Sequence, residues 1–311
     1  MKILGIALAV VLVSGLSLAN PPRPHHSGEA PWREPLSEDR SKDFSVREAN
    51  GEKIVVDNFL GMEWAGKASE NLDWYGAYDY CEKSTYAGYS DWRLPTYWEM
   101  ISIQLKYTKE QGVYPIFSHL KGKRAIWSSD DSVSIDQPDW DDRWALFVEP
   151  GLVTFELIKE EYTAQCIRGE EKPAAGPQGQ DRYKEIQPDL ILDTKANLLW
   201  TGPRNPKVSK ELLFTDVENW YVANLWCEDL VFAGRSDWRL PRLDEVVIIG
   251  DLRIPTVFTS MPKIPNSPLG FWTSSAAINP VGPANWIVDL LGQAYVHSKE
   301  EKHIFGCVHS N

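Results

Sequence analysis

A nine-residue segment occurs twice in this chain, and that duplication constrains the fold more than any other feature. The segment Ala87–Pro95 returns as Ala233–Pro241 with a single substitution, at Tyr89. Self-similarity of this kind indicates a repeat architecture, in which each copy forms the same structural unit. It also limits functional inference, because residues that are present in both copies are more often scaffold than site.

Other landmarks recur in the same order around the two segments. They are Asp57, Trp64, Trp74, Cys81, Trp127 and Cys166 in the first copy, and Asp193, Trp200, Trp220, Cys227, Trp272 and Cys307 in the second. An ordered series like this indicates a tandem duplication. Residues 170–182 are rich in Pro and Gly and are predicted to be a linker. The repeats then cover residues 43–169 and 183–311, each within the usual size of a domain.

The N-terminus resembles a secretory signal. Residues 1–19 place a charged Lys2 before an apolar run and end on Ser17-Leu18-Ala19, the small residues that a signal peptidase reads. The run is shorter than the roughly 20 apolar residues that a membrane span needs, so we expect cleavage and no span afterwards. An uncleaved anchor is the alternative. Residues 20–42 are Pro-rich and are predicted to be an extended tether. The mature protein is expected in the periplasm, at the cell surface or outside the cell.

The charge and the composition narrow the choice of partners. A formal net charge of -12 argues against nucleic acid and against an anionic membrane surface as the main partner. Fourteen Trp residues are many for a chain of 311, and they favour either a Trp-packed core or sugar-facing surfaces. Composition does not separate these two interpretations. A glycan or a protein of the envelope or surface is the expected partner.

The four cysteines fit an exported protein. They allow three pairings, and the repeat selects one, because each copy has one Cys in its helical part and one near its end. The expected bridges are Cys81–Cys166 and Cys227–Cys307. In the chain-entropy model each contributes about 4 kcal/mol, since each closes a long loop. Paired cysteines in exported domains usually have a structural role.

The periodicity of each copy predicts an α+β fold, with two helices followed by a small antiparallel sheet. Trp74, Ala77, Tyr78 and Cys81 fall on one face of a predicted first helix. In the second copy the corresponding stripe is Val217, Trp220, Tyr221 and Cys227, and Thr215 with Glu218 suggests a capping box.

A second helix is predicted to follow each Trp-Arg-Leu-Pro run. Thr96 and Glu99 form a capping box at its start, whereas the second copy has Arg242 in place of the Thr and keeps Glu245. We expect the second cap to be weaker by about 1 kcal/mol. Each copy then continues into a hairpin, over residues 144–157 and 286–296.

The central Ser-Asp-Trp-Arg-Leu-Pro motif, with its flanking Cys, Trp-Ser-Ser and final Cys, resembles an exported family named after the C-terminal domain of the Legionella collagen-like protein. The resemblance covers nearly all of residues 50–309. It implies a relative of the C-type-lectin-like fold, which also hosts formylglycine-generating enzymes. Two tandem C-type-lectin-like domains are therefore expected. Because the family has no established catalytic residues, the resemblance implies a binding or structural module.

The duplicated motif is interpreted as structural. Its residues are Asp91, Trp92, Arg93 and Pro95, and then Asp237, Trp238, Arg239 and Pro241. We expect each Asp to bond backbone N–H groups at a turn, each Trp to pack beneath the second helix, and each Arg to pair with Glu99 or Glu245. Asp, Arg and Glu could also form a catalytic set, but structural ion pairs imitate active sites, and their presence in both copies favours the structural role.

A difference between the copies is a better guide to a ligand site. The segment from Asp130 to Asp142 holds six aspartates, whereas the matching stretch 276–285 holds none. Several carboxylates on a short loop suit Ca²⁺, and the candidate ligands are Asp130, Asp131, Asp136, Asp139, Asp141 and Asp142. Gln137-Pro138-Asp139 resembles the sugar-binding tripeptide of C-type lectins, and Trp140 beside it could stack on a sugar. Against this, the lectins' downstream Trp-Asn-Asp is missing. A solvated acidic loop is the alternative.

Two further features carry less weight. His25 and His26 form a lone pair in the tether, which is weak evidence for a metal site. His297, His303 and His309 are evenly spaced, but we do not expect them to converge, because Lys299–Lys302 interrupts the strand that would align them. Calcium is thus the only candidate cofactor.

The function that these observations favour is an exported, non-catalytic binding module for a glycan or an envelope protein. A structural component of envelope or surface assembly is one alternative. The other is an enzyme related to formylglycine-generating oxidoreductases, which would need a free and accessible cysteine. If all four cysteines are paired, that enzyme is excluded.

Overall fold

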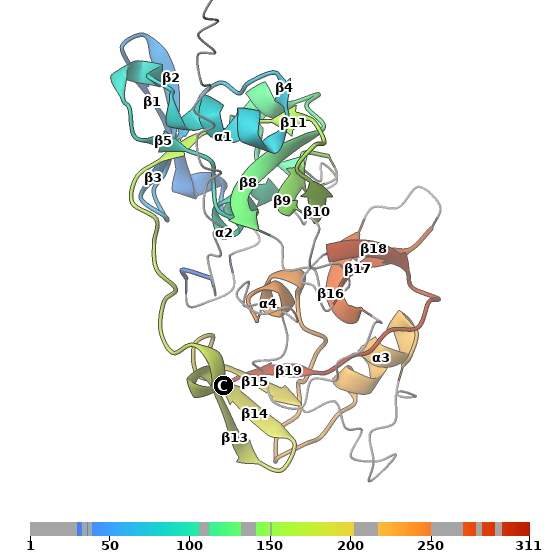
Figure 1. The fold of residues 1–311 in the computed structure, drawn as a ribbon. Helices are drawn as coiled ribbons and strands as arrows, with labels where there is room; N and C mark the ends of the chain where they lie inside the picture. Colours follow the sequence, from blue (N-terminus) through green and yellow to red (C-terminus); the bar gives the residue numbers. More distant parts are fainter. Residues whose placement is uncertain are drawn as a thin grey trace, which may run out of the picture.

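The two repeats lie against each other in a mostly stranded α/β structure (Figure 1). The structure is a computed structural model and describes residues 30–32, 36, 39–105, 112–131, 141–149, 151–201, 217–249, 270–277, 282–289 and 294–311. The predicted signal peptide lies outside the described residues, as does most of the predicted tether. Among the residues that are described, no helix is long and apolar enough to cross a membrane.

The first repeat contains two five-stranded sheets. One has the order β1-β2-β3-β12-β5, formed by β1 (Phe44–Ala49), β2 (Glu52–Asp57), β3 (Met62–Ala65), β12 (Ile167–Arg168) and β5 (Trp92–Arg93). The other has the order β10-β9-β8-β11-β4, formed by β10 (Leu152–Leu157), β9 (Asp142–Phe147), β8 (Ala125–Asp131), β11 (Tyr162–Thr163) and β4 (Asn71–Leu72). The helices α1 (Trp74–Glu82) and α2 (Tyr97–Ser102) lie between β4 and β8 in the chain, as does the short pair β6 (Gln104–Leu105) and β7 (Gly112–Val113). Three 3-10 turns, η1 (Ser41–Asp43), η2 (Tyr86–Gly88) and η3 (Pro115–Leu120), complete the repeat.

The second repeat follows the same plan with fewer strands in its described part. After η4 (Gly179–Arg182), the strands β13 (Tyr183–Gln187), β14 (Leu190–Asp193), β15 (Leu198–Thr201) and β19 (Val308–Ser310) form one sheet in that order. The other sheet has the order β16 (Phe271–Ala277), β17 (Ala284–Val288) and β18 (Ala294–Ser298). The helices are α3 (Trp220–Glu228) and α4 (Leu243–Val247).

The expectation of one small sheet per repeat is corrected by this topology. The hairpins form as predicted, with β9 pairing β10 and β17 pairing β18. The strand that closes each repeat, however, does not join the hairpin. It pairs antiparallel with an opening strand, β12 with β3 and β19 with β15. Each repeat therefore brings its two ends together in a sheet of their own.

The first helices begin at Asx caps. The side chain of Asp73 accepts a hydrogen bond from Gly76 N in α1, and that of Asn219 accepts one from Val222 N in α3. The predicted capping box at Thr215 and Glu218 does not mark the start of α3, which begins at Trp220 after the Asn219 cap; Thr215 itself lies outside the described residues.

The predicted stripe holds in α1, where Trp74, Ala77 and Cys81 are buried. In α3 the prediction fails at Tyr221, which is exposed. The buried residues of this helix are Ala223 and Cys227. Val217 precedes the helix, because α3 begins only after the Asn219 cap.

Both predicted disulfides are confirmed. Cys81 of α1 is bonded to Cys166, and Cys227 of α3 is bonded to Cys307. Cys166 lies immediately before β12 and Cys307 immediately before β19. Each bridge thus links the first helix of a repeat to the strand that closes it, and neither joins one repeat to the other.

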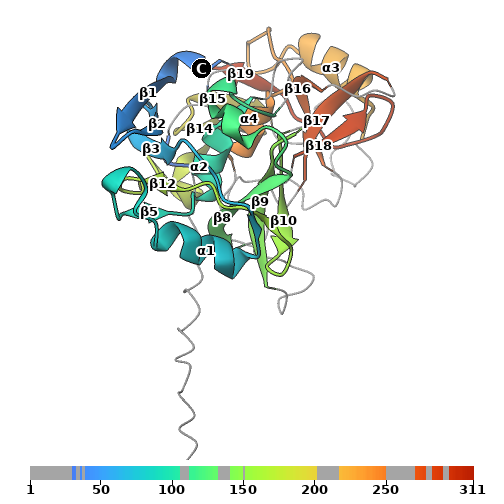
Figure 2. The ribbon, with the colours of Figure 1, turned by 90° about the horizontal axis from the view of Figure 1, so that it is seen from above.

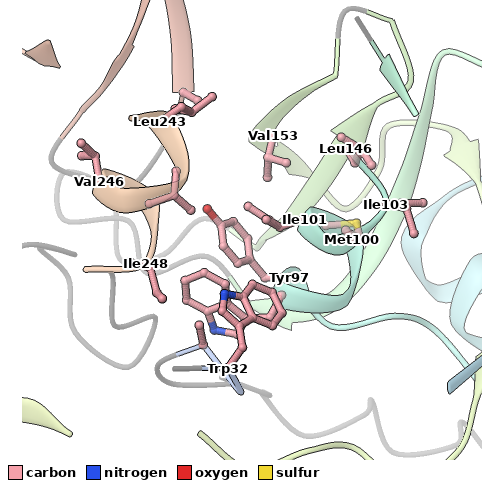
Figure 3. Packing of buried hydrophobic residues seen from close by; sticks show 14 of the residues in the cluster. Trp32, Tyr97, Met100, Ile101, Ile103, Leu146, Val153, Leu243, Val246 and Ile248 are labelled. Carbon is pink, nitrogen blue, oxygen red and sulfur yellow. The ribbon is translucent and has the colours of Figure 1, made fainter. Parts of the chain in front are cut away.

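A single hydrophobic cluster crosses the boundary between the repeats. It contains Tyr97 and Ile101 of α2 together with Leu243 and Val246 of α4. In Figure 2, α2 and α4 lie close to each other where the two halves meet, and Figure 3 shows Tyr97 pointing toward the side chains of α4. Both helices are buried along their whole length, and their packing removes apolar side chains from water. The repeats are therefore joined by a shared core as well as by the linker.

The predicted tether is not extended throughout. Ala30 and Trp32 are buried in the shared core, and Figure 3 shows Trp32 beside Tyr97 there. The Trp32 ring meets the Trp98 ring edge to face, with centroids 5.7 Å apart. The sequence missed this contact because a Trp in a Pro-rich segment carries no periodicity.

A buried arginine lies just before the predicted start of each repeat. Arg40 donates to Asp57 (2.8 Å) and to Ser102 O (2.5 Å). Arg182 donates to Asp193 (2.6 and 2.8 Å) and to Ile248 O (2.7 Å). In each repeat an arginine therefore joins the opening sheet to the end of the second helix. Because each charge is buried with an opposite charge, removing either partner would leave an uncompensated ion.

Candidate functional site

The duplicated motif holds the second helix of each repeat. Arg93 donates two hydrogen bonds to Glu99, at 2.8 and 2.7 Å, and Arg239 donates two to Glu245, at 2.7 and 2.6 Å. Burial alone would raise the pKa of Glu245, but the hydrogen bond and charge of Arg239 outweigh it and lower that pKa. The same carboxylates accept from the backbone N–H that precedes the helix, in Thr96 and in Arg242. The predicted ion pairs are confirmed, and each one engages the glutamate in the first turn of the second helix.

The tryptophans and aspartates of the motif differ from their predicted positions. Trp92 packs in the cluster of α1 and donates its indole N–H to Tyr86 O, so it lies against the first helix, not beneath the second. Trp238 lies with α3 in the same way. Asp91 accepts from Arg168 at 2.8 Å, which lowers its pKa, and Asp237 lies 3.4 Å from His309 Nε2. These aspartates contact side chains of the closing strand, which sequence spacing did not indicate.

The Ala-Gly dipeptide that opens the motif is explained by backbone geometry. Gly88 and Gly234 have φ of +83° and +72°, and the preceding Ala87 and Ala233 are also left-handed, at 55° and 53°. Only glycine adopts such a conformation without steric cost. The Ala-Gly dipeptide therefore recurs because the chain makes the same left-handed turn in each repeat, between the first helix and the Trp-Arg-Leu-Pro run.

The acidic segment is only partly described. Asp130 accepts from Tyr97 N at 2.5 Å, at the start of α2, and Asp131 forms an ion pair with Arg143 at 2.6 Å. Both carboxylates are buried and interact with the protein. Asp142 is also buried, and burial raises its pKa. Ser275 Oγ takes the place of Asp130 in the second repeat, where it accepts from Leu243 N at 2.9 Å.

Asp141 is described and exposed, and the remaining candidates of this segment lie outside the described residues. They are Asp136, Gln137, Asp139 and Trp140. The calcium and sugar hypotheses for the loop stay predictions. Two of the six proposed ligands, however, already bind other groups of the protein. Asp130 accepts from the first N–H of α2, and Asp131 pairs with Arg143.

A surface hollow of about 720 Å³ in the first repeat is the main candidate for a binding site. The β1–β2 turn, the end of α1 and η2 border this first-repeat hollow. Its hydrophilic lining residues are Asn50, Glu52, Lys67, Asp79, Lys83, Ser84 and Thr85, and its aromatic ones are Tyr80 and Tyr86. Pockets for small ligands usually measure about 300–1,000 Å³. Sequence reasoning missed the hollow because its walls come from separate segments.

Charged side chains and aromatic rings lie next to each other within the hollow. Lys67 Nζ lies 3.8 Å from Glu52 and 4.7 Å from the centre of the Tyr86 ring. The Tyr86 hydroxyl donates to Lys53 O at 2.6 Å, which fixes that ring in place. Tyr80 is 36% exposed, so part of its ring is available to a ligand. Such a surface offers hydrogen-bond donors, acceptors and an aromatic face within one concavity.

The comparison with protein families agrees with the duplication. The Lcl C-terminal domain matches residues 53–168 and again residues 189–309. The chain belongs to this family. No curated protein matches the chain. Each Lcl domain contains one disulfide, and the two bridges indicate an oxidising compartment outside the cytoplasm.

The second Lcl domain has a different surface where the first has its hollow. By alignment of the duplicated segments, Leu225 and Val231 replace Asp79 and Thr85. Leu225 is 57% exposed and Val231 74% exposed, and Tyr221 and Val222 beside them are exposed as well. The two domains of the pair therefore present different chemistry on equivalent elements.

The expectation that the C-terminal histidines do not converge is corrected for two of them. His297 of β18 and His303 come together with Glu301, and their ligand atoms all lie within 4.8 Å of one another. The chain turns at Lys299 and Glu300, so the two histidines meet across the turn rather than along one strand. His309 lies apart from them, against Trp238. Glu301, which lies between His297 and His303 in the sequence, was the signal that could have identified this cluster. The even spacing of the three histidines drew attention to a shared strand instead.

The electrostatics of this cluster follow from its burial. Burial, aided by the neighbouring His297, lowers the pKa of His303 to about 4. Burial would raise the pKa of Glu301, but the hydrogen bond and charge of His297 outweigh it and lower that pKa. At a pH well above 4, the cluster therefore holds the Glu301 carboxylate beside a neutral His303 imidazole.

Proposed function

We propose that this pair of Lcl domains is an exported, non-catalytic binding module that recognises a glycan of the cell envelope or surface through the first-repeat hollow. The observation that carries the proposal is the lining of that hollow, where hydrogen-bonding side chains surround the exposed part of Tyr80. Sugars present hydroxyl groups and apolar ring faces together, so a site that binds them needs both kinds of surface.

The fold and the compartment support this proposal. A C-type-lectin-like assignment of each repeat is consistent with paired first and last strands, and with a bridge between the first helix and the closing strand. All four cysteines are in disulfides, which argues against an enzyme that needs a free thiol. The net charge of -12 favours an uncharged or cationic partner over an anionic polymer.

The proposal is tested by a glycan array probed with the mature chain, with calcium and with a chelator. We expect a restricted set of glycans to bind, and Tyr80→Ala to weaken binding at least about fivefold, since stacking on a ring contributes on the order of 1 kcal/mol or more. The matched control is Tyr221→Ala, an exposed ring on the helix of the second repeat. Binding that is unchanged by Tyr80→Ala, or that is absent in both buffers, would contradict the proposal.

The same array separates the hollow from the acidic segment. If the segment 130–142 binds the sugar through calcium, binding disappears in the chelator and survives Tyr80→Ala. If the hollow binds the sugar, the chelator has no effect and Tyr80→Ala weakens binding.

A protein of the envelope is the second candidate partner, and one observation favours it. The exposed apolar side chains Tyr221, Val222, Leu225 and Val231 gather on and after α3. Exposed apolar groups of this kind are typical of protein contacts. In a pull-down from native envelope, the substitution Leu225→Asp should remove a partner that binds there and leave glycan binding intact. A partner that Leu225→Asp still captures would contradict binding at this surface.

A further inference from the structure

The C-terminal histidine cluster has the geometry of a metal site. His303 Nε2 lies 3.1 Å from His297 Nδ1, and Glu301 Oε2 lies 2.8 Å from His297 Nδ1 and 4.0 Å from His303 Nε2. Two imidazole nitrogens about 2.0–2.1 Å from a tetrahedral zinc ion stand roughly 3.3 Å apart. The observed separation of the nitrogens matches that value, and a small rotation of Glu301 equalises its two distances.

Hydrogen bonding alone does not satisfy this cluster. If His297 Nδ1 carries the proton, it must serve both Glu301 and His303 Nε2. If His303 Nε2 carries it, the unprotonated His297 Nδ1 faces a carboxylate oxygen at 2.8 Å, and two acceptors oppose each other. One cation between the three atoms satisfies all of them at once, because each offers a lone pair.

The surroundings hold each ligand in place. The second oxygen of Glu301 accepts from Ser298 N at 3.2 Å, which directs Oε2 toward the histidines. The backbone of His303 exchanges two hydrogen bonds with Glu218, at 3.1 and 3.2 Å. The His303 ring packs edge to face on Trp272, with centroids 4.7 Å apart. Supporting contacts of this kind orient metal ligands and raise metal affinity.

We propose that His297, Glu301 and His303 bind a divalent transition-metal ion, of which zinc fits best. Two imidazoles and one carboxylate suit zinc and related ions, whereas calcium takes six to eight oxygen ligands. Three protein ligands leave a fourth position for water or for a group of a bound partner. Glu301 is half exposed and His297 partly exposed, so that position opens toward solvent. The site lies in the second repeat, away from the first-repeat hollow, and stands independently of the proposed function.

Calorimetric titration of the untagged mature chain with Zn²⁺ tests the proposal, with Co²⁺ as a spectroscopic probe and Ca²⁺ as the comparison. We expect one Zn²⁺ per chain, cobalt absorption typical of four-coordination, and no competition from Ca²⁺. His297→Gln and Glu301→Gln should each lower zinc affinity by at least the roughly 10- to 100-fold that loss of an outer supporting contact produces. These two positions are chosen because they are not fully buried, so the variants should fold.

Two controls exclude other histidines. His309→Gln changes a histidine outside the cluster, and the double substitution of His25 and His26 by Gln removes the pair in the predicted tether. Both variants should bind zinc like the original chain. The proposal is overturned if no zinc is taken up, if His297→Gln and Glu301→Gln bind it unchanged, or if uptake is lost with His25 and His26.

Discussion

Single residues show where sequence spacing was sufficient and where it was not. The pairs Arg93–Glu99 and Arg239–Glu245 were predicted because a residue before a helix and a residue in its first turn are close by local geometry. The position of Asp91 was not, since its partner Arg168 lies 77 residues further along the chain. The packing of Trp92 was not, since it rests on the distant Trp127 and Cys166 as well as on α1. The histidine cluster was missed for the same reason, because a turn rather than a strand aligns it.

At the scale of single residues, the burial of His119 predicts how stability depends on pH. Its Nε2 donates to Gln165 Oε1 at 2.8 Å in one tautomer, while Nδ1 is buried without a partner among the described residues. Burial lowers its pKa, and Lys53 lowers it further. Below about pH 6.5 the unfolded chain therefore binds a proton that the native chain does not. The stability present above that pH is lost as the pH falls toward the folded pKa, with a slope of at most about 1.4 kcal/mol per pH unit.

Urea unfolding at pH 7.5 and at pH 5 measures this effect. The substitution His119→Gln keeps a donor for Gln165 and should reduce the loss of unfolding free energy between the two values. Part of the loss should remain, because the buried His303 also has a lowered pKa. An unchanged difference in the variant would show that His119 does not titrate as its burial requires.

At the scale of elements, local signals predicted helices better than sheets. The capping box of α2 is present with both hydrogen bonds, and both hairpins form. The pairing of the closing strands with the opening strands could not be predicted, because alternation along a strand does not identify its neighbour. For α3, the Thr215–Glu218 pattern predicted a start several residues before the one that the Asn219 cap sets.

The two copies of the second helix provide a matched test of capping. Thr96→Ala removes the hydroxyl that accepts from Glu99 N and should lower the unfolding free energy by about 1 kcal/mol. Arg242→Ala changes the equivalent position, where α4 has no side-chain cap bond to its own backbone, and should cost less. Chemical denaturation of the two variants side by side measures the difference. Equal losses would show that the hydroxyl is not what stabilises α2.

At the scale of the whole molecule, the duplication was predictable and the joint between the copies was not. Each copy carries its own pattern and disulfide, so both could be identified from sequence. Nothing in the pattern says which face of one copy meets the other. The shared core combines α2, α4 and Trp32, and the last of these comes from a segment with no periodicity.

The central claim is that two copies of one domain form a single cooperative unit through this shared core. Scanning calorimetry of the mature, disulfide-bonded chain tests it most directly. We predict one unfolding transition with equal calorimetric and van't Hoff enthalpies, and a shift of that whole transition to lower temperature in Trp32→Ala, which removes about 3–5 kcal/mol of packing. Two separate transitions, with only one of them moved by Trp32→Ala, would contradict the claim.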